Sequence, residues 1–533
     1  MKKNKPKHIE LFAGCGGMSL GLDAAGFELY FANELSPMAG ETFAYNILDE
    51  NLQDKAEMME ESLKVRWIKS KFPNNNLTDR LRENPLTARD GAFSDIKTIK
   101  DIRNKLLIGD IDQLLEFFLA NEDIVEKIVK DKIDLLSGGP PCQSFSLAGK
   151  REKNNKKNLL PLSFARIAGL LQPKVVLLEN VKGITSPFTE EGNKYYAWLE
   201  VSKAFALEGY VPVCMMLNSK FFGVAQNRPR FILYAFRLDI FNKVLSKKND
   251  SVILSSSLHF YQRVNDNIEH LEDVVVGDYR FYDIEEDRTL FNGEVFPLIT
   301  KIPGKFVSAT EAIGDIRRTK IKYRLSTITN GYGSNLNEVF RSHNGDDLEV
   351  RNHDPREHRF EVKARFRFYQ VINEFQNGLR KSAVDLFTGK EVIGEDLERL
   401  FSEFAEYNLY FSDHEGEHYR RPKSIAEVKQ LIESIPTKKH SQRALLEYEP
   451  APAQLTIPDD LCHYHMETLR TMTVREMARF QSFPDWFEFR SKVTTGGDSR
   501  KFEVPQYTQV GNAVPPLLAK ALGDYICKLL QIN

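Results

Sequence analysis

Short apolar segments alternate with helical segments through the first 236 residues, and this alternation limits the fold more than any other feature. The apolar segments that read as strands are residues 8–12, 28–34, 133–137, 174–178, 210–219 and 230–236. Between two of them, "NLLPLSFARIAGLLQ" has apolar residues at helical spacing. Strands separated by helices usually run in the same direction, so the sequence predicts an α/β fold with a mostly parallel sheet.

Composition excludes several classes of protein. The chain has 533 residues, 42% hydrophobic and 28% charged, and is long enough for two or more domains. Its five cysteines form no CxxC pair, so we expect neither a disulfide framework nor a metal site. No apolar run is long enough to cross a bilayer, and no apolar core follows the basic start. A net charge of −2 argues against a globally basic nucleic-acid coat. We expect a cytoplasmic protein in a reducing compartment.

The pattern changes three times along the chain. Residues 1–239 carry the strand–helix alternation, interrupted at 48–108 by a charged stretch that reads as an insertion with one or two helices. Residues 240–460 lose the alternation and are predicted to form a second, mixed domain. Residues 461–533 contain strong helical signals again, including a capping-box pattern in "TVREMARFQSF". We predict that this last segment returns to the first domain.

A glycine-rich turn, "LFAGCGG", follows the first strand and opens a helix. Glycines allow close backbone approach to a ligand, and a helix start offers free amide hydrogens. Glu34 ends the next strand twenty residues after Gly14, where a carboxylate can accept both ribose hydroxyls. Asp110, in "LLIGDID", can accept from an adenine amino group. The spacing predicts a nucleoside cofactor and leaves open a dinucleotide or S-adenosylmethionine, although the GxGG pattern favours the latter.

Reactive side chains follow three further strands. "GGPPCQSFS" places Cys142 on a rigid turn after the strand at 133–137, and the next strand ends at Glu179. The turn "GVAQNRPRF" brings Arg228 and Arg230. Ligands bind at the carboxyl edge of an open α/β sheet, so these groups are expected to converge there.

These motifs together resemble the DNA cytosine-5 methyltransferases of prokaryotic type. "FAGCGG", "GGPPCQSFSLAGKR", "ENVKG", "QNRPRF", "TVREMARFQSFP" and "QVGNAVPP" occur in the family's order, within residues 8–236 and 465–531. The resemblance implies a Rossmann-like class I methyltransferase domain, a smaller mixed target-recognition domain and S-adenosylmethionine as methyl donor. The implied cofactor residues are Phe12, Gly14, Cys15, Gly17, Glu34, Leu35, Asp110, Ile111, Pro141, Asn512 and Ala513.

The resemblance also implies the chemistry. Cys142 would add to carbon 6 of cytosine, which makes carbon 5 nucleophilic. Glu179 would donate a proton to ring N3, and Arg230, with Arg228, would hold the base's O2. Asn180 would anchor the backbone of the Cys142 loop. The reaction cannot occur inside a duplex, so the target base of double-stranded DNA must be flipped out.

Three stretches depart from the pattern or mimic another one. After "SLAGK" the family's acidic position is absent, with Asn155 and Lys157 at the corresponding places; the basic residues there suit phosphate contact. "HEGEH" at 414–418 matches a zinc-protease motif but is expected to lie in a loop. The basic–aromatic run at 351–368, which contains Arg365 and Arg367, is a candidate for contact with the DNA backbone.

The family resemblance leaves the biological setting open. We expect the enzyme to act as a monomer near the nucleoid of a prokaryotic cell, with a cognate restriction endonuclease as a possible partner. The alternatives are a tRNA cytosine-5 methyltransferase, a catalytically silent DNA-binding protein and a nicotinamide dehydrogenase. The large block at 240–460 disfavours a tRNA methyltransferase, and the presence of Cys142 and Glu179 disfavours a silent DNA-binding protein. A dehydrogenase would leave the "PPCQ" and "ENV" motifs unexplained.

Overall fold

The computed structural model describes most of the chain, with gaps. The described residues are 5–141, 160–190, 193–248, 251–319, 321–328, 331–341, 348–376, 378–414, 416–439, 441–454 and 456–530. Cys142 and the basic stretch at 150–157 lie outside these ranges, so the expectations attached to them are not addressed by the geometry below. Among the residues described, no helix is long and apolar enough to cross a membrane.

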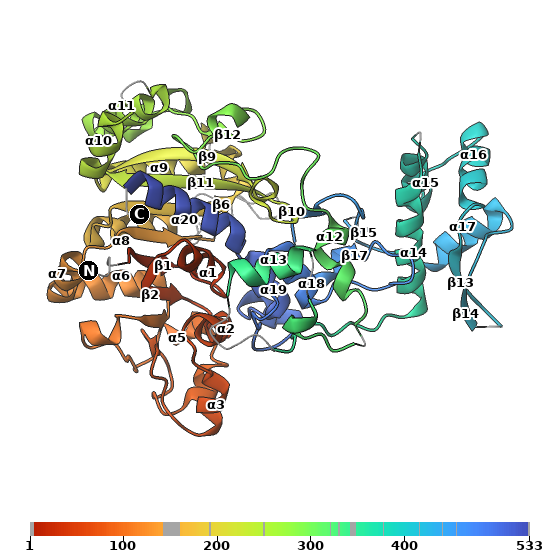
Figure 1. Ribbon diagram of the computed structural model, residues 1–533, viewed down its shortest axis with the longest axis horizontal. Coiled ribbons are helices and arrows are strands. Elements are labelled where there is room, and N and C mark those ends of the chain that lie inside the picture. Colours follow the sequence, from red (N-terminus) through yellow and green to blue (C-terminus); the bar gives the residue numbers. More distant parts are fainter. Residues whose placement is uncertain are drawn as a thin grey trace.

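A nine-stranded sheet lies in the left-hand part of the molecule in Figure 1. Its strand order is β12-β9-β11-β6-β5-β1-β2-β4-β3. Its strands are β1 (Lys7–Leu11), β2 (Glu28–Glu34), β3 (Val65–Trp67), β4 (Lys105–Ile108), β5 (Leu135–Gly138), β6 (Val175–Val181), β9 (Tyr210–Asn218), β11 (Pro229–Arg237) and β12 (Tyr282–Asp283). Every neighbouring pair is parallel except the two made by β11, which runs antiparallel to β6 and β9. The expected mostly parallel sheet is confirmed.

Helices cover both faces of this sheet. One face packs against α6 (Ile111–Ala120), α7 (Glu122–Lys130), α8 (Leu160–Leu171), α9 (Ala197–Leu207) and α11 (Val252–Asp266). The other face packs against α1 (Gly17–Ala24), α10 (Leu238–Ser246) and α20 (Pro516–Leu530). The strands between these layers are buried on both sides, which explains their almost continuous apolar sequences.

The last helix returns to the first one, as the sequence predicts (Figure 1). The contact depends on small residues, because a Cβ on Gly17 would lie 2.4 Å from the Val514 carbonyl oxygen and one on Gly21 2.4 Å from that of Pro516. The C-terminal segment thereby reaches the turn that opens α1.

The segment 48–108 contributes to the sheet as well as to its surface. Residues 105–108 form β4, which pairs with β2, and β3 adds an edge strand beside β4. The segment follows α2 (Pro37–Ile47) and also contains three short α-helices and one 3-10 helix: α3 (Leu52–Glu57), α4 (Leu77–Arg80), α5 (Pro85–Ala88) and η1 (Ile99–Asp101). The sequence reading of an insertion with one or two helices therefore gave too few helices and missed two strands. They are short, and charged residues surround them.

The first residues of the block at 240–460 still belong to the layers of the sheet. Ile240, Phe241 and Phe260 are buried in its two cores, and β12 pairs with β9. A domain boundary at residue 240 therefore does not coincide with the packing. The strand–helix rhythm ends near this point in the sequence, but the apolar faces of α10 and α11 still pack on the sheet.

Beyond the sheet lie a middle layer and an outer unit (Figure 1). The middle layer has its own core and contains α12 (Ala309–Ile313), α13 (Gly331–Val339), α18 (Val474–Phe480) and α19 (Gln506–Asn512). The outer unit has a separate core and contains α14 (Phe360–Glu374), α15 (Leu379–Phe387), α16 (Glu395–Phe404), β13 (Leu409–Asp413), β14 (Gly416–Arg420) and α17 (Ile425–Ser434). Thr473 and Glu476 form the predicted capping box at the start of α18.

Short strand pairs complete the described structure. They are β7 (Phe188–Glu190) with β8 (Asn193–Tyr195), β10 (Gln226–Asn227) with β16 (Ala451–Pro452), and β15 (Arg443–Ala444) with β17 (Leu461–Cys462). The β10–β16 pair joins the turn before β11 to the middle layer, and β15–β17 lies where the outer unit meets that layer.

Candidate active site

The turn after β1 has a backbone shape that favours glycine. Gly14 and Gly16 have φ of 56° and 97°, and Phe12, with φ 56°, also lies in the left-handed region. The Gly14 amide donates to Glu34 Oε2 at 2.8 Å, which ties the turn to the end of β2. A Cβ on Gly14 would meet no atom within 4 Å, so open space lies beside the turn.

Glu34 is held by backbone amides in an orientation that leaves acceptor capacity. Its Oε1 accepts from the Ser36 amide and its Oε2 from the Gly14 amide, both at 2.8 Å. Burial raises the pKa of Glu34, and these amide hydrogen bonds partly oppose the rise. Each carboxylate oxygen retains a second lone pair, so two hydroxyl groups can still bind here.

A narrow hollow lies next to Glu34, at the ends of β2 and β4. Its lining includes Leu35, Ile108 and Asp110, together with Trp67, Arg89 and other residues of the segment 48–108. Asp110 caps α6 by accepting from the Asp112 amide at 2.9 Å, and its other oxygen pairs with Arg89. The Ile111 side chain is buried in the core and does not line the hollow.

The C-terminal segment closes the same region. Ala513 is 9% exposed and Asn512 is exposed, next to the Val514 carbonyl that contacts Gly17. Cys15 is buried, with its Sγ 3.8 Å from the Gln509 carbonyl oxygen, and burial raises its pKa. The Cys15 thiol is therefore neutral, and it packs between the glycine turn and the C-terminal segment.

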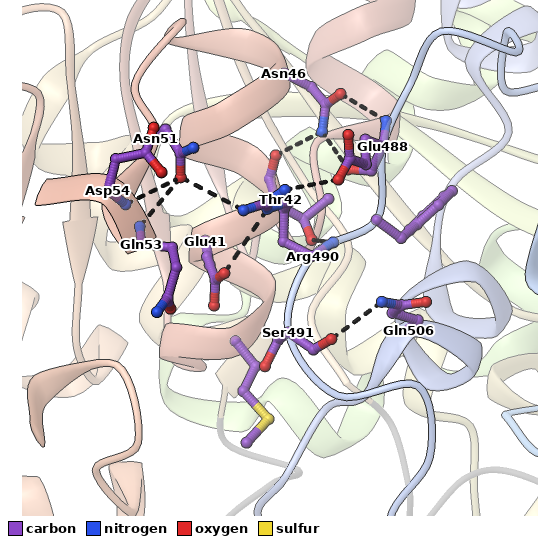
Figure 2. A network of polar contacts seen from close by, with 12 residues as sticks. Glu41, Thr42, Asn46, Asn51, Gln53, Asp54, Glu488, Arg490, Ser491 and Gln506 are labelled. Atoms are coloured by element: carbon purple, nitrogen blue, oxygen red, sulfur yellow. Dashed lines mark hydrogen bonds and ion pairs between the residues drawn. The ribbon is translucent and has the colours of Figure 1, made fainter. Parts of the chain in front are cut away.

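A polar network fixes this C-terminal return to α2 (Figure 2). Thr42 Oγ1 donates to Gln509 Oε1 at 2.6 Å and accepts from the Arg490 amide at 2.9 Å. Asn46 exchanges two hydrogen bonds with the backbone of Glu488, at 2.8 and 2.9 Å. Because α2 begins just after Glu34, the network holds the two halves of the candidate cofactor site in register.

The carboxyl ends of β5 and β6 carry the second group of predicted residues. The ion pair between Arg230 Nε and Glu179 Oε1 is 2.6 Å long, and both side chains are largely buried. The antiparallel direction of β11 explains the meeting, because its first residues lie beside the last residues of β6. Asn180 Nδ2 donates to the Pro140 carbonyl at 3.0 Å, so it anchors the turn before Cys142. A Cβ on Gly139 would lie 2.9 Å from Glu179 Oε2, so glycine permits this close approach.

Arg228 is placed differently from Arg230. Its buried guanidinium donates to the carbonyl oxygens of Gly511 at 2.8 Å and Ala513 at 3.2 Å. Burial lowers the pKa of Arg228, and the positive charge of Arg230 lowers it further. The contacts favour a structural role for Arg228, in which it fixes the C-terminal return beside the site, over the contact with the base's O2 that was expected.

Other sequence candidates lie away from this edge or are only partly described. Pro141 is exposed and is the last residue described before Cys142. In the described part of "HEGEH", His418 lies on β14 opposite Phe411, in a hairpin and not on the helix that a zinc-protease motif requires. No group of three or more potential metal ligands is found in the ranges that the structure covers.

Arg365 and Arg367 do not form the surface that the basic–aromatic run suggested. They are 9% and 6% exposed. Arg365 donates to the carbonyls of Ile435 and Pro436 at 3.1 and 2.8 Å, and Arg367 to that of Asn408 at 2.7 Å. The expectation that these two guanidinium groups contact DNA phosphate was wrong, because α14 is the central helix of the outer unit and they satisfy carbonyls inside it.

Sequence reasoning missed Trp67, Arg89, Thr42 and Gln509. Strand β3, which carries Trp67, is three residues long, and Arg89 sits in a charged stretch without a motif. Thr42 and Gln509 are 467 residues apart, and nothing in their local patterns signals the contact.

Comparison with known proteins agrees with this geometry. The model of the C-5 cytosine-specific DNA methylase family matches residues 7–77 and 87–528. The type II methyltransferase M.DdeI of Desulfomicrobium norvegicum is 25% identical over 97% of this chain and 88% of its own. M.XorII of Xanthomonas oryzae is 25% identical over 99% of this chain and 86% of its own. M1.HphI of Haemophilus parahaemolyticus is 23% identical over 98% of this chain and 87% of its own.

The fold and site define an α/β methyltransferase, with a glycine turn and an acidic strand end on one side and a Glu–Arg pair on the other. The chain belongs to the C-5 cytosine-specific DNA methylase family. It is a DNA (cytosine-5-)-methyltransferase, and DNA is its substrate. A dehydrogenase, a tRNA methyltransferase and a silent DNA-binding protein are set aside by this result.

Proposed function

We propose that the enzyme transfers a methyl group from S-adenosylmethionine to carbon 5 of a flipped-out cytosine, through a covalent bond to Cys142. The observation that carries the proposal is the Glu179–Arg230 pair beside the anchored Pro140–Pro141 turn, at the sheet edge that also holds Glu34. When bound, S-adenosylmethionine supplies an electrophilic methyl group.

The residues near Glu34 fit an adenosine cofactor. Glu34 can accept from the two ribose hydroxyls, and Asp110, which lines the narrow hollow next to it, can accept from the adenine amino group. Phe12 and Gly14 form part of the glycine turn, Leu35 lines the hollow, and Ala513 lies beside Gly17. Pro141 and Asn512 are exposed. Cys15, Gly17 and the Ile111 side chain support this site from the packed side, as the contacts above describe.

Cys142 is one of five cysteines in the sequence, and it follows the turn that Asn180 anchors. The other four cysteines, Cys15, Cys214, Cys462 and Cys527, are all buried. Burial raises the pKa of each of these thiols, which keeps them protonated and unreactive. This supports Cys142, which follows the anchored turn, as the nucleophile.

Glu179 and Arg230 divide the remaining work on the base. A carboxyl group at Glu179 can protonate ring N3 as the thiolate adds to carbon 6, which builds the enamine that attacks through carbon 5. The carbon 5 proton then leaves to water, the bond between Cys142 and carbon 6 breaks by elimination, and the N3 proton returns to Glu179. Arg230 orients that carboxyl and can hold the base's O2. Arg228 and Asn180 hold the flanking backbone in place, so the attack geometry is preset.

The outer unit is proposed to read the DNA sequence. It has a separate core and is carried at a distance from the sheet (Figure 1). A protein reads a DNA sequence through side chains that reach base edges. The residues of the catalytic site serve chemistry that the whole family shares, so the side chains that distinguish one target from another are expected elsewhere. The similarity to type II methyltransferases further suggests that this enzyme protects host DNA alongside a restriction endonuclease.

Covalent trapping tests the assignment. A duplex with 5-fluorocytosine at the target should link to wild-type protein, and peptide mapping should place the bond on Cys142. Cys142→Ser should lose methyl transfer and keep S-adenosylhomocysteine binding in calorimetry. Attachment to another cysteine, or activity in the serine variant, would refute Cys142 as the nucleophile.

A further inference from the structure

The hollow next to Glu34 has one wall that the methyltransferase motifs do not supply. Leu35, Ile108 and Asp110 line it at the ends of β2 and β4, whereas Trp67, on the edge strand β3, and Arg89 line its outer side. We propose that residues 67–89 form the outer wall of the adenine pocket, and that Arg89 is a positioning residue that aims the Asp110 carboxylate at the adenine 6-amino group. This inference rests on S-adenosylmethionine being the cofactor.

The wall is held in place by its own contacts. The Arg80 guanidinium lies 5.0 Å from the Trp67 ring centroid and pairs with Asp95 at 2.7 Å. Asp95 also accepts from the Trp67 amide at 2.9 Å. Trp67 is therefore fixed both by the Arg80 guanidinium next to its ring and by the hydrogen bond at its backbone. Trp67 is 2% exposed, and its Nε1–H has no acceptor among the described residues. A fixed apolar ring with an unused donor suits a purine neighbour.

The wall is also joined to the sheet at the floor of the hollow. The Ile68 amide donates to the Ile108 carbonyl at 2.8 Å. A Cβ on Gly109 would lie 2.8 Å from Ile68 Cβ, so the two chains touch there. Glu83, which also lines the hollow, accepts from Ser70 Oγ at 2.7 Å and from the Lys71 amide at 2.8 Å. Residues 67–89 are therefore held against the hollow by specific contacts and do not form a loosely attached surface loop.

Arg89 connects this wall to the residue that would recognise adenine. Its guanidinium pairs with Asp110 Oδ2, and its carbonyl accepts from Gln113 Nε2 at 2.9 Å. Asp110 Oδ1 is used by the Asp112 amide. Both oxygens are thus fixed, and each keeps one lone pair for an amino group. Without Arg89, Asp110 could turn and the hollow would lose part of its rim.

Cofactor binding with an analogue separates positioning from general packing. Calorimetry should compare S-adenosylhomocysteine with its analogue that lacks the 6-amino group. Wild-type protein should prefer the amino form. Arg89→Ala should weaken S-adenosylhomocysteine binding about tenfold and weaken the analogue much less, so that the preference shrinks. Arg89→Lys should restore part of the preference, because a cation returns to Asp110.

Arg103→Ala is the matched control. Arg103 pairs with Asp131 at 2.5 Å and is 43% exposed, against 38% for Arg89, but it does not line the hollow. It should leave both affinities unchanged. Equal binding by Arg89→Ala and wild type, or equal losses for both ligands, would overturn the positioning role. Failure of wild-type protein to bind S-adenosylhomocysteine at all would instead refute the cofactor proposal itself.

Trp67 gives an independent readout of position. The chain has three tryptophans, and only Trp67 lines this hollow. S-adenosylhomocysteine should change the tryptophan emission of the wild type, and Trp67→Phe should lose most of that change while retaining the signal of Trp198 and Trp486. An unchanged response in Trp67→Phe would show that the wall does not face the cofactor.

Discussion

At the scale of single residues, Glu10 is a carboxyl group buried inside the sheet. It lies on β1, is 2% exposed and bonds to the Ser19 hydroxyl on α1. Burial raises its pKa to about 8, with hydrogen bonds from Ser19 opposing the rise and Glu34 adding to it. The folded protein therefore holds a proton at neutral pH that the unfolded chain releases.

This proton predicts a pH dependence of stability. Between pH 4.5 and about 8 the unfolded state ionises Glu10 and the folded state does not, so the free energy of unfolding should fall as pH rises. The fall should be on the order of a few kcal/mol. Glu10→Gln keeps a neutral group beside Ser19 and should be free of this contribution. Urea unfolding at pH 5 and pH 8 measures it: the advantage of the variant over wild type should grow with pH, and a constant difference would contradict the assignment.

Single residues also show where sequence was informative. Glu179 and Arg230 were predicted to meet because motifs at strand ends converge at one edge of the sheet, and the structure pairs them. The contacts of Arg228 and Arg365 were not predicted, because arginine has the same one-letter symbol in a core as on a surface. Their partners are backbone carbonyls contributed by distant segments, and no local pattern reports those.

At the scale of elements, the α1–α20 contact is the joint that makes a single site from both ends of the chain. Glycines on α1 set the distance between the two helices. Gly21, in the middle of α1, leaves no room for a side chain. A Cβ there would lie 2.4 Å from the Pro516 carbonyl oxygen and 2.5 Å from Ala519 Cβ. Backbone cannot move aside as a flexible side chain can, so the two helices would have to separate.

Gly21→Ala should therefore destabilise the protein, although alanine is the better helix former by about 1 kcal/mol. We expect a net loss of about 2 kcal/mol in the free energy of unfolding, together with weaker cofactor binding, because Ala513 and Val514 would shift with α20. Gly277→Ala is the matched control: that glycine is exposed and its added Cβ would meet no atom within 4 Å, so its effect should stay within about 0.5 kcal/mol. Equal stability of the two variants in urea would show that the helices can separate freely.

The elements were predictable where their patterns were long. The strands at 28–34 and 210–219 are strongly apolar, and each appears close to its expected bounds. Strand β3 and the strand pairs around 443–462 have two or three residues each, so only their partners define them. The direction of β11 was likewise not readable, since an apolar strand looks the same in either orientation.

At the scale of the whole molecule, the chain leaves the sheet once and returns once, and the outer unit lies between these crossings. Its core is formed almost entirely by residues 364–462. Residues 238–283 belong instead to the layers of the sheet, through α10, α11 and β12. The change of sequence character near residue 240 thus marks the end of the strand–helix alternation and not the start of a new body.

This division predicts which exchange of segments will move the target sequence. Replacing residues 360–462 with the matching unit of a relative that methylates another sequence should give a folded enzyme, because the core of the outer unit leaves as a whole and the nine-stranded sheet is untouched. Bisulfite sequencing of DNA from expressing cells should then show methylation at the relative's site. Replacing 240–460 should instead prevent folding, because Phe241 and Phe260 are removed from the two cores of the sheet. Unaltered cofactor affinity in the smaller chimera is the control for its fold. If that chimera is active and still methylates the original sequence, the outer unit is not the reader, and the middle layer or the segment 48–108 must supply the contacts to the bases.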